Sequence, residues 1–392
     1  MWDRCLQDGV NHSDGHSIPL YSHVAFRDKV GPIGSCNSNA NLGNKGTGDC
    51  VPAPSLERAL QLTIVRNARF SAFDAQWQHP AITEQHAWRH IAKRVTALAA
   101  SDWHYVAFPW ATLIDKLHRR TLDSSDLLAQ YRAFSADLPP KTRRVTVCQH
   151  IKAREFSWLF AEANISHVFW SHATRRDQER PRTPEFRPFP LFPVQVTHAL
   201  PEAALEYDTT SRPYLYCFVG ARADRYYPAR TRNHILRNLV TDPRGFVVGR
   251  PIWHFQRVVY DFQVEGLAST GAALIDDGAS DLFREVLRRS RFALCPSGTG
   301  PNSIRLWEAL GSGTIPVILS DTWEPPGGRD LWDAAAVFAP ETLDSVLTLP
   351  NQLAKLATDP ERLASMRHAG RQLWARYGPE GFVGDVIDLM SH

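Results

Sequence analysis

The chain has 392 residues, with 44 basic and 41 acidic side chains and a net charge of +3. That length suits two domains of ordinary size, and a hydrophobic content of 43% with 22% charged residues excludes a disordered chain. The near balance of charge disfavours nucleic-acid binding, which usually needs a concentrated basic face. We therefore expect a globular protein with no nucleic-acid partner.

Segments typical of membrane insertion or export are not evident. The longest largely apolar stretch, residues 105–114, is about half as long as a membrane-spanning helix. Residues 1–10 carry Asp3, Arg4 and Asp8 in place of the apolar core of a signal peptide. We therefore expect a cytoplasmic protein, and association with the inner face of a membrane stays open.

Six cysteines are spread along the chain without a CxxC or CxxH pair, which disfavours a structural zinc site. Cys148, Cys217 and Cys295 lie in apolar runs typical of strands, and we expect them to be buried and reduced. Cys36 and Cys50 flank a loop rich in Gly and Asn, and their spacing does not decide whether they pair.

The first part of the chain changes character near residue 54. Residues 1–55 are rich in Gly, Asn, Ser and Asp, so we expect an irregular segment, either a cover over an active site or a mobile stretch. Helices and short apolar strands then alternate, which predicts a parallel sheet with helices on both faces. The expected helices are 84–100, 127–134 and 154–163, and the expected strands are 104–108, 145–150 and 167–170.

A charged, proline-rich stretch over residues 175–213 interrupts this alternation. Dense proline prevents a continuous helix and favours an extended connector, so we place a domain boundary near residue 205. The alternation then restarts, which predicts a second Rossmann-like domain over residues 206–392 after a first over 1–205. Its expected strands are 214–220, 246–249, 292–295, 315–319 and 337–339, and its expected helices are 229–239, 279–289, 302–310, 342–357, 361–377 and 380–390.

The most informative segment covers residues 291–321. A buried strand ends at Pro296, and Gly298 and Gly300 allow the backbone of the next loop to approach a ligand closely. A helix is expected to begin at Asn302. A helix N-terminus at the carboxyl edge of a parallel sheet attracts anions, because its free N–H groups and its dipole face the ligand. The sequence therefore predicts an anion site at this loop.

Three side chains on this helix suit a nucleotide-sugar donor. Ser303 can donate to a phosphate oxygen, Arg305 can neutralise a diphosphate, and Glu308 can accept both hydroxyls of a ribose or sugar ring. Arg305 and Glu308 could instead form a surface ion pair, worth a few tenths of a kcal/mol. The complete string favours binding, and Ser297, Gly298 and Asn302 complete the expected donor-binding set.

The same string resembles the C-terminal signature of the exostosin family of inverting glycosyltransferases. The matching positions are Ser290-Arg291-Phe292, Leu294, Pro296, Gly298, Ser303, Arg305, Glu308-Ala309, Gly313, Ile315-Pro316-Val317 and Ser320-Asp321. Residues 218–222, followed by Arg230, resemble the strand that opens the same domain. The similarity is weak outside residues 214–340.

The resemblance implies a GT-B fold, in which two Rossmann-like domains with parallel sheets face a cleft and helices follow at the C-terminus. It also implies metal-independent transfer with inversion, no cofactor, a donor held by the C-terminal domain and an acceptor held largely by the N-terminal one. Arg305 would hold the diphosphate, Glu308 the ribose, and Arg222 would stabilise the leaving diphosphate. A UDP-sugar is favoured as donor. The chain lacks the membrane anchor and much of the N-terminal pattern of animal members, which favours a bacterial surface glycan, with a glycan or lipid-linked acceptor.

An inverting transfer needs a general base for the acceptor hydroxyl and charge stabilisation for the leaving group. His150 and His172 follow expected strands of the N-terminal half, and the carboxyl ends of such strands meet at the cleft. They are the first candidates for the catalytic base, with His172 preferred. Further options are Asp74, Asp102 and His104.

Two other functions stay open. The chain could be another GT-B nucleotide-sugar enzyme, such as an epimerase or a retaining transferase, but retaining members usually carry a second Glu where this chain has Pro301. A non-catalytic nucleotide- or glycan-binding module would keep Ser303, Arg305 and Glu308 but lack a productive base. Turnover assays separate such a module from an active transferase.

Overall fold

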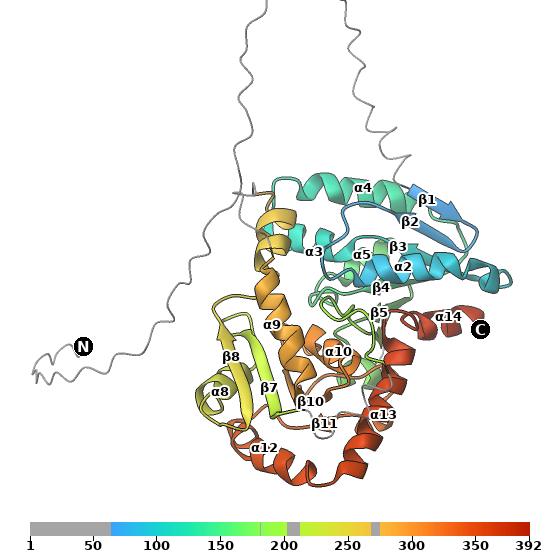
Figure 1. Cartoon of the computed structure of the whole chain (residues 1–392). Helices are drawn as coiled ribbons and strands as arrows, with labels where there is room; N and C mark the ends of the chain where they lie inside the picture. The colour runs from blue at the N-terminus through green and yellow to red at the C-terminus, as the bar shows by residue number, and fades with distance from the viewer. Residues whose placement is uncertain (1–63, 181, 202–211, 268–274) are drawn as a thin grey trace, which may run out of the picture. The chain divides into compact units, whose positions relative to one another are not determined.

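The computed structural model describes residues 64–180, 182–201, 212–267 and 275–392 (Figure 1). Two expectations, the irregular segment over residues 1–55 and the domain boundary near residue 205, lie outside the described residues. Every contact discussed below belongs to residues 54–392, which cluster as one unit.

The first sheet has six strands in the order β1-β2-β3-β4-β5-β6. The strands are β1 (Ile64–Asn67), β2 (Phe70–Phe73), β3 (Trp103–Ala107), β4 (Arg143–Cys148), β5 (His167–Trp170) and β6 (Glu185–Pro188). Strands β2 to β6 pair in parallel, and β1 pairs with β2 in antiparallel register. The predicted parallel sheet is confirmed apart from this edge strand, where a two-residue connection is too short for a parallel crossover.

Among the described residues, six helical segments accompany this sheet. They are α2 (Thr83–Lys93), the 3₁₀ turn η1 (Val95–Leu98), α3 (Trp110–Arg119), α4 (Ser124–Ala136), α5 (Ser157–Glu162) and α6 (Arg175–Glu179). The single helix expected over residues 84–100 is divided, because consecutive β-branched Val95 and Thr96 disfavour its continuation. Helix α3 was not predicted, because its first seven residues are all buried and continue the apolar run of the preceding strand.

The expected connector over residues 175–213 is wrong for its first part. Helix α6 begins with a capping box between Thr174 and Asp177, and β6 extends the first sheet beside β5. Pro188 ends β6, which is an edge strand of the sheet, and an edge strand tolerates proline because its outer N–H groups have no ladder partner.

The second sheet has five parallel strands in the order β11-β10-β9-β7-β8. The strands are β7 (Tyr214–Ala221), β8 (Gly245–Arg250), β9 (Ser290–Pro296), β10 (Ile315–Leu319) and β11 (Val337–Phe338). All five predicted strands of this half are present, with ends within two residues of the expected ones.

The second half carries seven α-helices and one π-helix among its described residues: α8 (Thr231–Asn238), π-helical η3 (Arg257–Val264), α9 (Asp277–Arg288), α10 (Ile304–Gly311), α11 (Arg329–Asp333), α12 (Leu343–Leu356), α13 (Pro360–Tyr377) and α14 (Gly384–Ser391). Helix α14 packs against the first sheet, where Val386 and Met390 join a core with Trp103 (Figure 1). Two parallel α/β sheets followed by C-terminal helices confirm the predicted fold class. In the part of the chain that is described, no helix is long and apolar enough to cross a bilayer.

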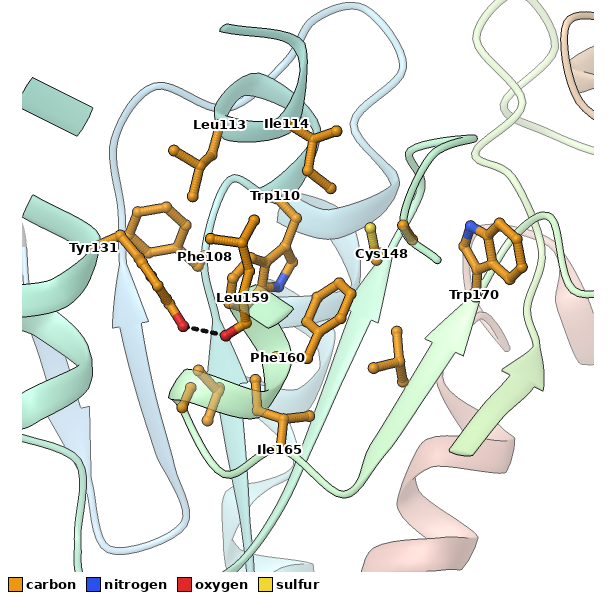
Figure 2. Close-up of a cluster of buried hydrophobic side chains, with 14 of the residues drawn as sticks. Phe108, Trp110, Leu113, Ile114, Tyr131, Cys148, Leu159, Phe160, Ile165 and Trp170 are labelled. Carbon is orange, nitrogen blue, oxygen red and sulfur yellow. Dashed lines mark hydrogen bonds between the residues drawn. The ribbon is translucent and has the colours of Figure 1, made fainter. Parts of the chain in front are cut away.

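One core of the first sheet fixes helix α3 beside the strand ends. Figure 2 shows Trp110, Leu113 and Ile114 of this helix packed among aromatic side chains, and the Tyr131 hydroxyl donates to the Leu159 carbonyl. Burial of each such side chain contributes about 1.5–3 kcal/mol. The three described cysteines, at 148, 217 and 295, are buried and unpaired, as predicted.

Candidate functional site

A cavity of about 1460 Å³ lies at the carboxyl edges of the two sheets. Residues that follow β4 and β5 line it from the first half, and residues that follow β7, β8, β9 and β10 line it from the second. Hydrogen bonds join the halves beside it: for example, Asn302 Nδ2 donates to the Ser171 carbonyl at 2.8 Å, and the Gln195 N–H donates to Glu308 Oε1 at 2.8 Å. The strand ends predicted to meet at a cleft are thus brought together.

The predicted anion loop lies on this cavity between β9 and α10. Helix α10 begins at Ile304, two residues later than expected, and Ser303 is its N-cap without a side-chain capping bond. The backbone at position 300 lies so close to the first half that only glycine fits there, because a Cβ would lie 2.5 Å from His172 Nδ1 and 2.8 Å from Ile151 Cγ2. The loop therefore lies directly against the first half.

Arg305 is buried beneath this loop, with 8% of its surface exposed, and still lines the cavity. Its Nη2 donates to the Val219 carbonyl at 2.6 Å, and its guanidinium lies 4.6 Å from the centre of the Phe218 ring. Its Nε and Nη1 are buried without a hydrogen-bond partner among the described residues. Unpaired buried donors are costly, so these two groups are suited to an anionic ligand.

Arg232, on the first turn of α8, is a second buried guanidinium that sequence reasoning missed. Its Nε donates to the Ser297 carbonyl at 2.9 Å and its Nη1 to the Ala221 carbonyl at 3.4 Å. Burial and the nearby charge of Arg305 lower its pKa to about 10. The available signal was a second arginine just after Arg230, at the start of a helix that follows a strand.

The two guanidinium groups of Arg232 and Arg305 concentrate positive charge on one wall of the cavity. Within the described residues, every hydrogen bond from either group goes to a backbone carbonyl, and neither makes an ion pair with a carboxylate. Two buried like charges in this position repel each other and have lost their hydration, and both costs are offset when an anion binds between them.

Glu308 lies on the same helix, one turn beyond Arg305, and is 2% exposed. Burial raises its pKa to about 7, against the opposing effects of the Gln195 N–H and the Arg305 charge. The alternative of a surface ion pair between Glu308 and Arg305 is wrong, because both side chains are buried and line the cavity.

The other expected donor-binding residues take different positions. The Ser297 hydroxyl donates to the Glu341 carboxylate, Gly298 lies on the cavity, and Arg222 is exposed at its edge. Asn302 lines the cavity too, but its amide is engaged within the protein, because its Nδ2 reaches the first half and its Oδ1 accepts the Trp307 Nε1–H at 3.0 Å. Its present contacts hold the loop in place.

His172, the preferred base of the sequence analysis, lines the cavity but is closely packed. Gly300 lies against its ring, and its Nδ1 is buried without a hydrogen-bond partner among the described residues. Burial, together with the nearby His150, lowers its pKa to about 3. The ring is therefore neutral across the physiological range of pH.

His150 forms a buried pair with Asp115, a residue of α3 that sequence reasoning missed. His150 Nε2 lies 3.1 Å from Asp115 Oδ1, and the Lys152 N–H donates to His150 Nδ1 at 3.0 Å. Burial alone would raise the pKa of Asp115, but the His150 ring and the Gln78 amide outweigh it, so the pKa lies below its usual value. A carboxylate within an otherwise apolar run was the available signal.

The three further base options do not line the cavity. Asp74 accepts the Trp77 Nε1–H at 2.7 Å, and Asp102 is an exposed residue 3.9 Å from Arg143. His104 is buried against Ser71, with its Nε2 3.0 Å from that hydroxyl. No group of three or more His, Cys, Asp or Glu among the described residues is placed to hold a metal ion, and metal-independent transfer stays a prediction.

The profile of the Exostosin GT47 domain matches residues 146–353, more than half of the chain. The chain belongs to the exostosin GT47 family. The family match includes the end of β4 together with β5 and β6 of the first half, and all five strands of the second. The predicted family resemblance is thereby confirmed, and the GT47 family consists of glycosyltransferases.

Individual relatives share shorter segments with this GT47 chain. Exostosin-1a of Danio rerio is 35% identical over 96 residues, which are 24% of this chain and 13% of the relative. Exostosin-1 of Drosophila melanogaster is also 35% identical over 96 residues, 24% of this chain and 12% of the relative. The match thus spans about an eighth of the length of these curated relatives.

Solved structures resemble the chain more distantly. Anabaena HepE in complex with UDP-glucose has a TM-score of 0.42 and 12% identity, over 77% of this chain and 81% of that one. WaaG, a glycosyltransferase involved in lipopolysaccharide biosynthesis, has a TM-score of 0.42 and 12% identity, over 82% of this chain and 99% of that one.

Proposed function

We propose that this protein is an inverting glycosyltransferase that moves a sugar from a nucleotide-sugar donor, with a UDP-sugar favoured, to a hydroxyl of a glycan or glycolipid. The observation that carries the proposal is the pair of buried guanidinium groups, Arg232 and Arg305, which face the cavity without a carboxylate partner among the described residues. Their charge and free donors match a diphosphate.

The donor is assigned to residues 206–392. Its diphosphate lies between the two arginines and the loop of Ser297 to Ser303, which leads into the start of α10. Each charge-assisted hydrogen bond contributes about 1.5–3 kcal/mol. The Glu308 carboxylate accepts the ribose hydroxyls, and Arg222 at the cavity edge assists the leaving diphosphate.

Transfer requires charge stabilisation on the donor side and a proton acceptor on the other side of the sugar. Arg232 and Arg305 supply the positive charge that a metal ion supplies in other transferases, so transfer proceeds without a metal. The acceptor is assigned to residues 1–205, which contribute His150 and His172 to the cavity. The acceptor hydroxyl attacks from that side and the configuration of the sugar inverts.

The wider setting follows from the same proposal. The sugar is added to a bacterial surface polysaccharide in the cytoplasm, at the inner face of the membrane when the acceptor is lipid-linked. Arg222 and Arg230 are exposed and line the cavity, and their positive charge suits a hydroxylated or anionic saccharide.

A thermal-shift panel of UDP, GDP, CMP, UDP-glucose and UDP-N-acetylglucosamine, with and without EDTA, tests the donor site. A nucleotide at about 100 times its dissociation constant stabilises the protein by about 2.7 kcal/mol. We expect a shift with a nucleoside diphosphate that EDTA leaves unchanged, and its loss in Glu308→Ala. A chain that no nucleotide stabilises contradicts the proposal. A chain that binds nucleotide but releases none from any donor is a binding module.

A further inference from the structure

Asp115 is a buried carboxylate whose position needs a reason. It follows Leu113 and Ile114, which point into the core of the first half (Figure 2), but its own side chain lines the cavity. Fully buried aspartates are rare unless they are paired. Its two oxygens accept hydrogen bonds from different elements: Oδ1 faces His150 Nε2 at 3.1 Å, and Oδ2 accepts from Gln78 Nε2 at 2.8 Å.

The hydrogen bonds of His150 decide where its proton lies. The Lys152 N–H donates to Nδ1 at 3.0 Å, so Nδ1 uses its lone pair and carries no proton in the neutral ring. The proton is therefore on Nε2, which donates to Asp115. Both nitrogens of His150 are engaged, and neither can accept a proton from an acceptor hydroxyl in this arrangement.

The Asp115 carboxylate does retain that capacity. Each carboxylate oxygen has two lone pairs, and His150 and Gln78 use one on each oxygen. The two hydrogen bonds hold the carboxylate in one orientation, and general base catalysis depends on a side chain that is positioned in this way. His172, packed against Gly300, is less suited, because its free nitrogen is covered by the loop.

We propose that Asp115 is the general base of the transfer and that His150 is its positioning residue. The inference rests on the proposed function. The acceptor oxygen forms a bond to the anomeric carbon while the bond from that carbon to the diphosphate oxygen breaks. The electron pair of the broken bond leaves with the nucleoside diphosphate toward Arg232 and Arg305, and the acceptor proton passes to the Asp115 carboxylate, which later returns it to water.

Glu84 supports this assignment by holding the two segments that carry the pair. Its carboxylate accepts the Ala111 N–H at 3.2 Å and the Gln149 N–H at 3.0 Å. Ala111 lies one turn before Asp115 on α3, and Gln149 precedes His150. A buried carboxylate that bridges these two backbone positions keeps the spacing of the pair constant.

The test compares Asp115→Asn with wild type and with Glu155→Gln in the full-length chain. Glu155 lines the same cavity but is 61% exposed and paired with Lys152, so it is a matched control for the loss of one carboxylate. The donors are UDP-glucose, UDP-galactose, UDP-N-acetylglucosamine and UDP-glucuronate, with water and methyl glycosides as acceptor probes. The readouts are the rate of UDP release and the thermal shift by UDP.

We expect Asp115→Asn to lower kcat by at least about 100-fold, as for a lost general base, with KM for the donor and the UDP shift unchanged. Glu155→Gln should retain its rate. Asp115→Glu keeps the charge but moves the carboxylate, so this variant should fold and also lose kcat. It therefore tests the base role even if Asp115→Asn fails to fold.

Three results overturn the inference. An Asp115→Asn protein that keeps more than a tenth of the wild-type kcat refutes the role of Asp115 as base but leaves the donor site intact. If His172→Asn then loses kcat at least about 100-fold, the base is His172. Wild-type protein that binds UDP but releases no UDP from any donor, with any acceptor probe, also contradicts the role of Asp115 as base. Wild-type protein that no nucleotide stabilises refutes the donor site, and the base role with it.

Discussion

Replacing Arg305 by Met separates a ligand-binding arginine from a structural one. Met keeps much of the length of the side chain and removes the charge. In the absence of nucleotide the change loses the bond to the Val219 carbonyl, but it also removes two unpaired buried donors and the repulsion with Arg232. These effects are each about 1–3 kcal/mol and opposite in sign, so we expect the free energy of unfolding to change by less than about 2 kcal/mol.

The effect on nucleotide binding has no such compensation. Loss of two charge-assisted hydrogen bonds from Arg305 to a diphosphate costs about 3 kcal/mol, which raises Kd about 150-fold. At a UDP concentration of about 100 times the wild-type Kd, stabilisation falls from about 2.7 to about 0.3 kcal/mol. For 392 residues the unfolding entropy is about 0.8 kcal/mol per kelvin, so the shift in Tm falls from about 3 °C to below about 0.5 °C.

Isothermal titration calorimetry and thermal melts with UDP measure both quantities on the full-length chain. Arg288→Met is the matched control, because Arg288 is 51% exposed on α9 and pairs only with its helix neighbour Glu285 among the described residues. We expect the control to bind UDP like wild type. An Arg305→Met protein with UDP affinity within about threefold of wild type refutes the diphosphate assignment. Destabilisation beyond about 4 kcal/mol without nucleotide shows a structural role.

Two further predictions follow from the same wall of the cavity. A Cβ at Gly220 would overlap the end of the Arg305 side chain, so Gly220→Ala should weaken UDP binding at least about tenfold in calorimetry, with little change in Tm. Gly278→Ala is the control, because its Cβ meets only Asp276 at 3.5 Å, and it should bind UDP like wild type. Equal UDP affinities of the two variants contradict this prediction. Burial raises the pKa of Glu308 to about 7, from about 4.5 in the unfolded chain. The protonated side chain therefore favours the folded state fully below pH 4.5, and this stabilisation, about 3 kcal/mol in total, is lost as the pH rises through 7. In urea melts between about pH 5 and 8, the unfolding free energy of Glu308→Gln should therefore fall less steeply with pH than that of wild type. An equal dependence on pH in both proteins contradicts the raised pKa of Glu308.

Local patterns were sufficient for the strands of the second half of the chain, whereas the π-helix η3 and the short helix α11 were not predicted. Its strands β9 and β10 are runs of apolar residues closed by proline, glycine or serine, and the helix between them carries the family signature. Every determinant of that segment lies within about thirty consecutive residues, so neither its position nor its family required knowledge of the rest of the chain. The position of the donor loop at a strand end followed from the same alternation.

Errors arose where the neighbours of an element decide its structure. Helix α3 begins inside the apolar run that starts in β3, and its first seven residues are buried, so the boundary between strand and helix was not recognised from the sequence. Strand β6 forms beside prolines because it is an edge strand next to β5. In both cases the packing of distant segments outweighs the local signal.

The amino-acid sequence by itself determined the two-sheet α/β class, the exostosin family and the loop that faces the cavity, because each is encoded in a short contiguous pattern. Only the tertiary structure decided that Arg232 joins Arg305 as a second buried cation, and that His150 is paired with Asp115 and not free. Burial, hydrogen-bond partners and pKa depend on residues far apart in the chain, so the charge and the proton at such a site follow from the folded arrangement.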